Sequence, residues 1–136
     1  MKIYEDHIRT KMKKEVETKS PFTDDEIIYL YALTKTLAYY NKRISLKAYQ
    51  DNSTCLIKKK GLWEIYQIED TYRLNRFIYS EITEACNHIL SLLKDKNSFG
   101  IMQLYLSNNI SQKEIIAFAS KYNITRENPI QRIKRI

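Results

Sequence analysis

Glycine and proline are both scarce in this sequence, with two residues of each among 136. Loops that cradle phosphate groups need glycines, because only glycine lets the backbone wrap closely around the anion. Gly61 and Gly100 each stand alone, outside any glycine-rich motif. The sequence therefore argues against nucleotide-dependent chemistry, and we expect the protein to use no cofactor.

Histidine and cysteine are equally rare, again with two residues of each. A zinc site needs several such ligands at fixed spacings, and these four residues do not form such a pattern. Cys55 and Cys86 lie in apolar segments without a CxxC neighbour, which favours free buried thiols. The acidic run at 24–26 is explained by the first turn of a capped helix. We expect no metal site.

Catalysis by nucleophiles or by acids and bases requires clustered polar side chains in recognised contexts, and none appears in the sequence. His7 lies among charged residues, and His88 lies in an apolar helical pattern typical of a structural histidine. We therefore expect a protein that is not an enzyme.

Long apolar runs are absent, since no stretch approaches the roughly 20 residues that cross a bilayer. The first residues lack the apolar core of a signal peptide. We expect a cytoplasmic protein without a membrane partner. A length of 136 residues fits one domain, so residues 1–136 are predicted to form a single domain.

The chain is basic, with a net charge of +7. This charge favours an acidic partner, either nucleic acid or an acidic protein surface. A general compositional bias towards lysine explains the charge equally well.

Two capping boxes mark helix starts, Thr23 with Glu26 and Ser111 with Glu114. The first opens a helix that ends near Asn41, and the second opens a helix over 111–122. The residues Tyr4, Ile8, Met12 and Val16 are spaced four apart, which predicts a further helix over 1–19. A short apolar helix is predicted over 99–106.

Residues 54–79 predict a small three-stranded antiparallel meander, because strand-like segments at 54–58, 62–68 and 74–79 are separated by turns. An amphipathic helix capped by Ser80 follows and is expected to cover this sheet. The predicted fold class is α+β, with helical N- and C-terminal segments around the sheet. Its parts are the N-terminal helices 1–41, the sheet and covering helix 54–95, and the C-terminal helices 98–124.

The centre of the chain carries short motifs that resemble a known family. Residues 61–69 read GLWEIYQIE, a second strand ends in FIYS at 77–80, and EAC at 84–86 opens an apolar helix. This arrangement resembles the small immunity proteins of bacterial polymorphic and contact-dependent toxin systems, over roughly residues 24–95. The turn at 69–71 reads EDT where that family tends to have E-R-G.

The resemblance implies a protein that binds one cognate toxin domain and covers or distorts its active site. The basic charge would suit a toxin with an acidic surface. We expect the interface on charged and aromatic residues of the hairpin and third strand, taken to be exposed: Lys58, Lys59, Lys60, Tyr66, Glu69, Asp70, Tyr72, Arg73 and Arg76.

The alternative hypothesis is nucleic-acid binding through a helix-turn-helix made by 111–122 and the segment after Thr125. Pro129 fits this reading poorly, because it would lie inside the recognition helix. The residues expected to contact phosphates in that case are Arg126, Arg132, Lys134 and Arg135.

Overall fold

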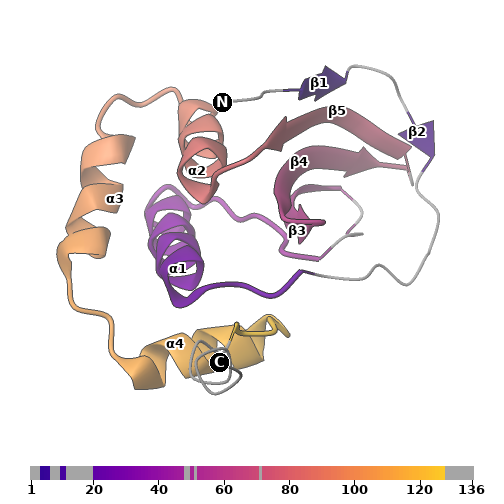
Figure 1. The fold of residues 1–136 in the computed structure, drawn as a ribbon. Helices are drawn as coiled ribbons and strands as arrows, with labels where there is room; N and C mark the ends of the chain where they lie inside the picture. The colour runs from indigo at the N-terminus through magenta and orange to yellow at the C-terminus, as the bar shows by residue number, and fades with distance from the viewer. Residues whose placement is uncertain are drawn as a thin grey trace.

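The computed structural model describes residues 4–6, 10–11, 20–47, 50, 52–70 and 72–127 (Figure 1). The strands are β1 (Tyr4–Asp6), β2 (Thr10–Lys11), β3 (Ser53–Lys59), β4 (Leu62–Glu69) and β5 (Tyr72–Tyr79). The helices are α1 (Asp24–Tyr39), α2 (Ile82–Ser91), α3 (Ser98–Ser107) and α4 (Gln112–Lys121). The predicted α+β class is confirmed.

The meander formed by β3, β4 and β5 is antiparallel throughout, as predicted. Lys60 and Gly61 connect β3 to β4 with φ angles of 53° and 78°. A two-residue hairpin turn of type I′ requires a positive φ at both residues, and its twist matches the twist of the two strands that it joins. The register between β4 and β5 shifts between Ile65 and Gln67, so the sheet carries a bulge there.

β1 and β2 extend the sheet, because both pair antiparallel with the outer edge of β5. The helix predicted over 1–19 is therefore wrong at residues 4–6 and 10–11, and the rest of that prediction lies outside the described residues. A spacing of four residues is also twice the strand period, so the apolar stripe was compatible with either structure. Without β1 and β2, the outer edge of β5 would leave its backbone N–H and C=O groups unpaired. Pairing with this edge favours the extended conformation for residues 4–6 and 10–11.

α1 begins as the sequence predicts. The Thr23 hydroxyl accepts a hydrogen bond from the Glu26 amide at 3.1 Å, and the Glu26 carboxylate accepts one from the Thr23 amide at 2.8 Å. After the helix, Asn41 has a φ of 57°, which ends it at the predicted place. At α4 the Ser111 hydroxyl accepts from the Glu114 amide at 3.2 Å, so Ser111 is the N-cap as predicted. The Glu114 carboxylate accepts from the Ser111 hydroxyl at 3.3 Å, so the predicted second capping box is only half formed.

The N-cap of α2 differs from the prediction. Glu81 occupies the cap position, and the Ser80 hydroxyl donates instead to the Glu84 carboxylate at 3.2 Å. The helix itself spans the predicted apolar residues and buries Ala85 and Cys86. The structure therefore moves the start of this helix by one residue without changing its buried face.

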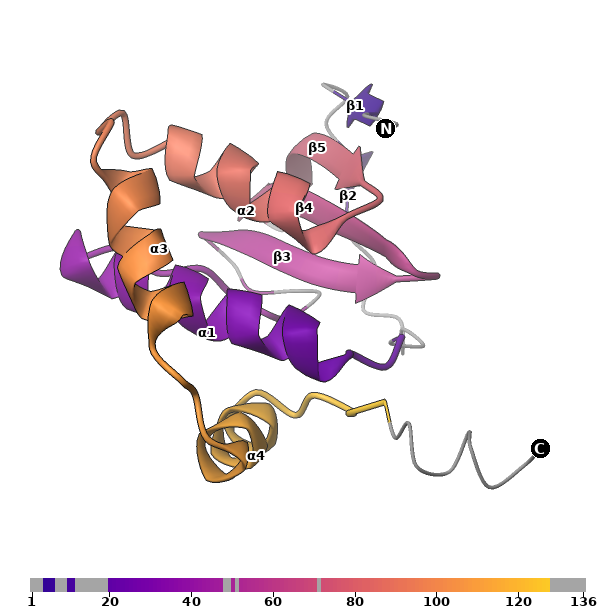
Figure 2. The same ribbon diagram turned by 60° about the vertical axis from the view of Figure 1, so that its left-hand side comes forward.

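One hydrophobic core joins the sheet to the helices. Leu56, Trp63 and Ile65 come from one face of the sheet and share a cluster with buried residues of α1, α2, α3 and α4. Figures 1 and 2 show α1 and α2 beside the sheet, with α3 and α4 on the far side of α1. Within the described ranges, no helix has both the length and the apolar character needed to cross a bilayer.

Candidate partner-binding surface

The nine residues predicted for the interface do not share one surface. Side chains alternate along a strand, and the pairings Cys55↔Tyr66 and Ile68↔Arg73 place those residues on the face away from α1 and α2. By the same alternation, Lys59, Tyr66, Arg73 and Arg76 lie on that outer face, whereas Lys58, Glu69 and Tyr72 lie on the helix-covered face. Lys60 and Asp70 occupy the two turns at opposite ends of β4.

Tyr66 was expected to be exposed, and this expectation is wrong. Its side chain is 1% exposed and belongs to a second small cluster with Cys55, Ile57 and Ile68 on the outer face of the sheet. The Arg73 guanidinium lies 6.0 Å from the Tyr66 ring centre. Tyr66 therefore stabilises the sheet and offers little surface to a partner.

Lys58 and Arg76 are held in ion pairs within the protein. Lys58 Nζ lies 2.8 Å from a Glu26 carboxylate oxygen and donates to the Pro21 carbonyl at 2.8 Å. Arg76 Nε lies 2.9 Å from a Glu64 carboxylate oxygen. Both side chains therefore help to hold the fold, which corrects their expected role as free interface residues.

The exposed members of the predicted set are Lys60, Glu69 and Asp70. Lys59, Tyr72 and Arg73 are half-buried. The exposed residues carry one positive and two negative charges and lie at both ends of β4, so the hairpin does not present a uniformly basic patch.

The basic C-terminal region is described only as far as residue 127. There, Arg126 makes two hydrogen bonds to the Asp24 carboxylate, at 3.0 Å from Nε and 2.9 Å from Nη2, and a third to Gln112 at 3.1 Å. The hydrogen bond from Arg126 to Asp24 raises the pKa of the guanidinium. Arg126 therefore fastens the end of the described chain to the start of α1, while Arg132, Lys134 and Arg135 lie outside the described residues.

His88 has a structural position. Its Nδ1 shares a hydrogen bond with the Tyr79 hydroxyl, and its ring centre lies 4.3 Å from that of Phe77. These contacts join α2 to β5. Among the residues that the structure describes, no three histidine, cysteine or acidic side chains are grouped so that they could hold a metal ion.

Both cysteines are free and buried, as predicted. Burial raises the pKa of Cys55 to about 11 and that of Cys86 to about 12. At about pH 8 we expect a disulfide reagent to react with Cys55 roughly 100-fold, and with Cys86 roughly 1,000-fold, more slowly in the folded protein than in urea, because the thiolate fraction falls tenfold per pKa unit. Absorbance after adding the reagent measures this rate, and the Cys55→Ala and Cys86→Ala variants assign it.

The same shifts have a consequence for stability. A thiol whose pKa is raised on folding stabilises the protein fully below its ordinary pKa of 9.0, and this contribution is lost as the pH rises towards about 11 to 12. If either thiol reacted in the native protein as fast as it does in urea, the buried position of that cysteine would be wrong.

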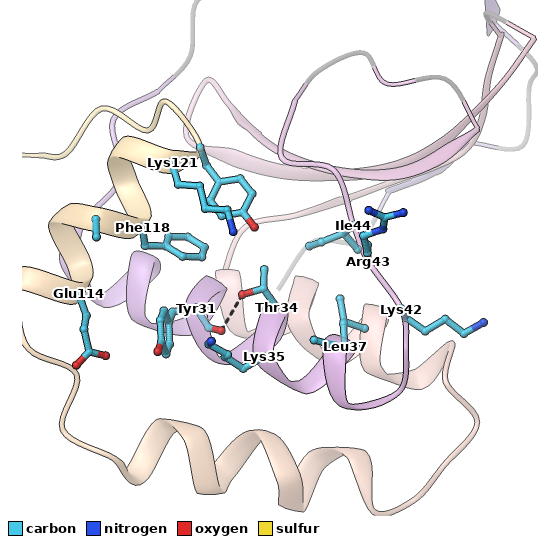
Figure 3. A pocket seen from close by; sticks show the side chains of 13 residues that line it. Tyr31, Thr34, Lys35, Leu37, Lys42, Arg43, Ile44, Glu114, Phe118 and Lys121 are labelled. Carbon is cyan, nitrogen blue, oxygen red and sulfur yellow. Dashed lines mark hydrogen bonds between the residues drawn. The ribbon is translucent and has the colours of Figure 1, made fainter.

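The structure also contains a groove of about 450 Å³ between α1, α4 and the segment 42–44 (Figure 3). Its apolar lining includes Tyr31, Leu37, Ile44, Phe118 and Tyr122. Sequence reasoning missed this groove, because its lining comes from segments far apart in the chain. The helical patterns indicated which faces of α1 and α4 are apolar but not that these faces line a groove together with the segment 42–44.

No protein-family model matches this chain, and searches of curated proteins and of solved structures give no match either.

Proposed function

We propose that this chain is an immunity protein, which binds one cognate bacterial toxin and neutralises it by protein–protein contact. The observation that carries the proposal is that the residues bearing the resemblance form one packed unit. Trp63 in β4 is paired with Tyr79 in β5, and the Tyr79 hydroxyl is hydrogen-bonded to His88 in α2. Ala85 and Cys86, from the EAC motif, are buried in the same core as Trp63.

A packed unit of this kind suits a binding protein. Strands and helices that bury a shared core hold the backbone under the exposed side chains in place, so little backbone entropy is lost when a partner binds. The net charge of +7 suits a toxin with an acidic surface. Neutralisation would take place in the cytoplasm of the cell that the toxin threatens.

The alternative of nucleic-acid binding has less support. Arg126, the one described residue of the four expected to contact phosphates, is already held by Asp24 and Gln112. Tight binding of DNA or RNA that weakens steeply with salt would nevertheless favour this alternative over immunity.

The proposal is tested in two steps. The tagged chain is first purified from its native host, and mass spectrometry identifies the protein that stays bound. That protein's toxic domain is then expressed in a sensitive cell with and without this chain. We expect survival only with the chain, and complete inhibition of the purified toxin at equimolar ratio, because a binding inhibitor acts stoichiometrically.

Two outcomes would contradict immunity. One is a bound partner whose toxicity the chain does not reduce. The other is inactivation of many toxin molecules by one molecule of this chain, which would indicate an enzyme.

A further inference from the structure

The groove between α1 and α4 has an aromatic floor. The ring centres of Phe118 and Tyr122 are 4.7 Å apart, and those of Phe118 and Tyr31 are 5.9 Å apart. Phe118 is buried, whereas Tyr31 and Tyr122 are half-buried and keep part of their surface open to the groove. Ala38 on α1 and Ala117 on α4 line the same groove and are exposed. Their small side chains leave room for another chain to approach the floor.

The rim of the groove is positively charged. Lys35, Lys42, Arg43 and Lys121 all line it and are exposed, against a single acidic residue, Glu114. Lys35 Nζ lies 5.4 Å from the Tyr31 ring centre, and Lys121 Nζ lies 5.4 Å from that of Tyr122. Within the described part of the chain, none of these four cations forms a salt bridge. Their charge is therefore available to an incoming anion.

The charges are also distributed unevenly along the groove. Figure 3 shows Glu114 at one end, beside Tyr31, and Lys42 and Arg43 at the other end. Burial and the neighbouring Glu114 carboxylate raise the pKa of the Tyr31 hydroxyl at this end of the groove. An occupant would therefore meet positive charge along most of the groove and a polar, acidic corner at one end.

We propose that this groove is the docking site for an acidic segment of a partner protein that carries a large apolar side chain. The apolar side chain would pack on Phe118, Tyr122 and Ile44, and flanking carboxylates would pair with the rim cations. If the partner is the toxin, this proposal rests on the proposed function and deepens it by assigning the surface and the chemistry of the toxin segment. The chain's own residues 128–136 fit poorly, because they add three basic residues and no acidic side chain.

Charge complementarity is the reason for choosing an acidic protein segment. Rim charges of this kind steer association and fix the orientation of the bound segment more than they add affinity, whereas the apolar floor supplies the contact area. The combination matches a segment in which acidic and large apolar residues alternate. A nucleic acid carries a negative charge at every nucleotide and would place a phosphate against Glu114, whereas a protein segment can place an uncharged residue there.

The test uses a synthetic pentapeptide in which glutamate and phenylalanine alternate, blocked at both ends. Two comparison peptides alternate lysine with phenylalanine and glutamate with serine. Each is titrated into the full-length ¹⁵N-labelled protein and followed by NMR. We expect saturable shifts for amides at 34–44 and 114–122 with the first peptide and at least tenfold weaker binding of the other two. Raising the ionic strength from about 0.05 M to about 0.5 M should weaken the first interaction.

Two groove variants sharpen this test. The double variant Lys42→Glu with Arg43→Glu should raise the dissociation constant of the glutamate–phenylalanine peptide about tenfold or more, because two attractive charges become repulsive. Ala117→Trp should have a similar effect by filling the groove without changing its charge. The matched control is Lys94→Glu with Lys96→Glu, which makes the same charge change at exposed positions outside the groove. It should alter affinity less than twofold.

Three outcomes would overturn the docking proposal: shifts that fall outside the groove, equal affinity for the lysine–phenylalanine peptide, or no saturable binding of the acidic peptide. A loss of affinity in the Lys94 and Lys96 control equal to that in the groove variant would do the same, because the effect would then come from net charge alone. Neutralisation of a toxin is measured separately, so the immunity proposal can stand or fall independently of these results.

Discussion

Replacing Trp63 with alanine is expected to lower the free energy of unfolding by about 4 kcal/mol, as large aromatic-to-alanine changes in protein cores do. The side chain is 1% exposed, and its ring centre lies 5.2 Å from that of Phe22 in an edge-to-face contact. Lys58 Nζ lies 5.8 Å from the same ring. Trp63 thus connects β4 to the segment that leads into α1, and its removal would leave a cavity where the sheet and the first helix meet.

Urea unfolding followed by far-UV circular dichroism measures this loss. Fluorescence is unsuitable, because Trp63 is the only tryptophan in the chain. Leu62→Ala is the matched control, since Leu62 is the preceding residue on the same strand and is 42% exposed. We expect it to cost about 0.5 kcal/mol or less, as surface substitutions usually do. If the two variants lost equal stability, the assignment of Trp63 to the core would be wrong.

The sequence predicted those elements whose signals are local. Thr23 and Glu26 are three residues apart and form the capping box that their spacing indicated. The turn at Lys60 and Gly61 joins two strand-like segments and forms a hairpin. In each case the interacting groups are neighbours in the chain, so the pattern of residue types already contains the geometry.

The strands β1 and β2 could not be predicted in this way. Their pairing with β5 joins Tyr4 to Ile78 and Thr10 to Arg73, which are distant in sequence. Nothing in the first residues distinguishes an apolar stripe on a helix from alternate residues of a strand. The free edge of β5, which exists only once the sheet has formed, supplies the information that the local pattern lacks.

The charged residues of the candidate site were misjudged for a related reason. Lys58 pairs with a carboxylate 32 residues away, and Arg126 pairs with one 102 residues away. In the sequence each of them looks like a free surface charge. The groove depends equally on long-range packing, because α4 contributes Phe118 and Lys121 while α1 contributes Tyr31 and Lys35. Sequence patterns indicate which residues are charged, but only the fold determines which charges remain available to a partner.

The second large effect is expected at the ion pair between Arg76 and Glu64. Glu64 is 5% exposed, and Arg76 Nε donates to its carboxylate at 2.9 Å. Arg76→Ala would leave a buried carboxylate without this partner, which is strongly destabilising because a charge in a poorly solvated position loses its compensation. We expect a loss of about 2 kcal/mol, less than for a fully buried pair because the Arg76 side chain is 25% exposed.

A double-mutant cycle separates this pairing from the packing of the arginine side chain. Glu64→Gln removes the charge that needs a partner, so Arg76→Ala should cost about 1 kcal/mol less in that background than in the native protein. Arg43→Ala is the matched control, because Arg43 is exposed and takes part in no salt bridge recorded among the described residues. It should change stability by about 0.5 kcal/mol at most. A cost for Arg76→Ala as small as that of Arg43→Ala, or the same cost in both backgrounds, would show that the ion pair does not stabilise the bulged region of the sheet.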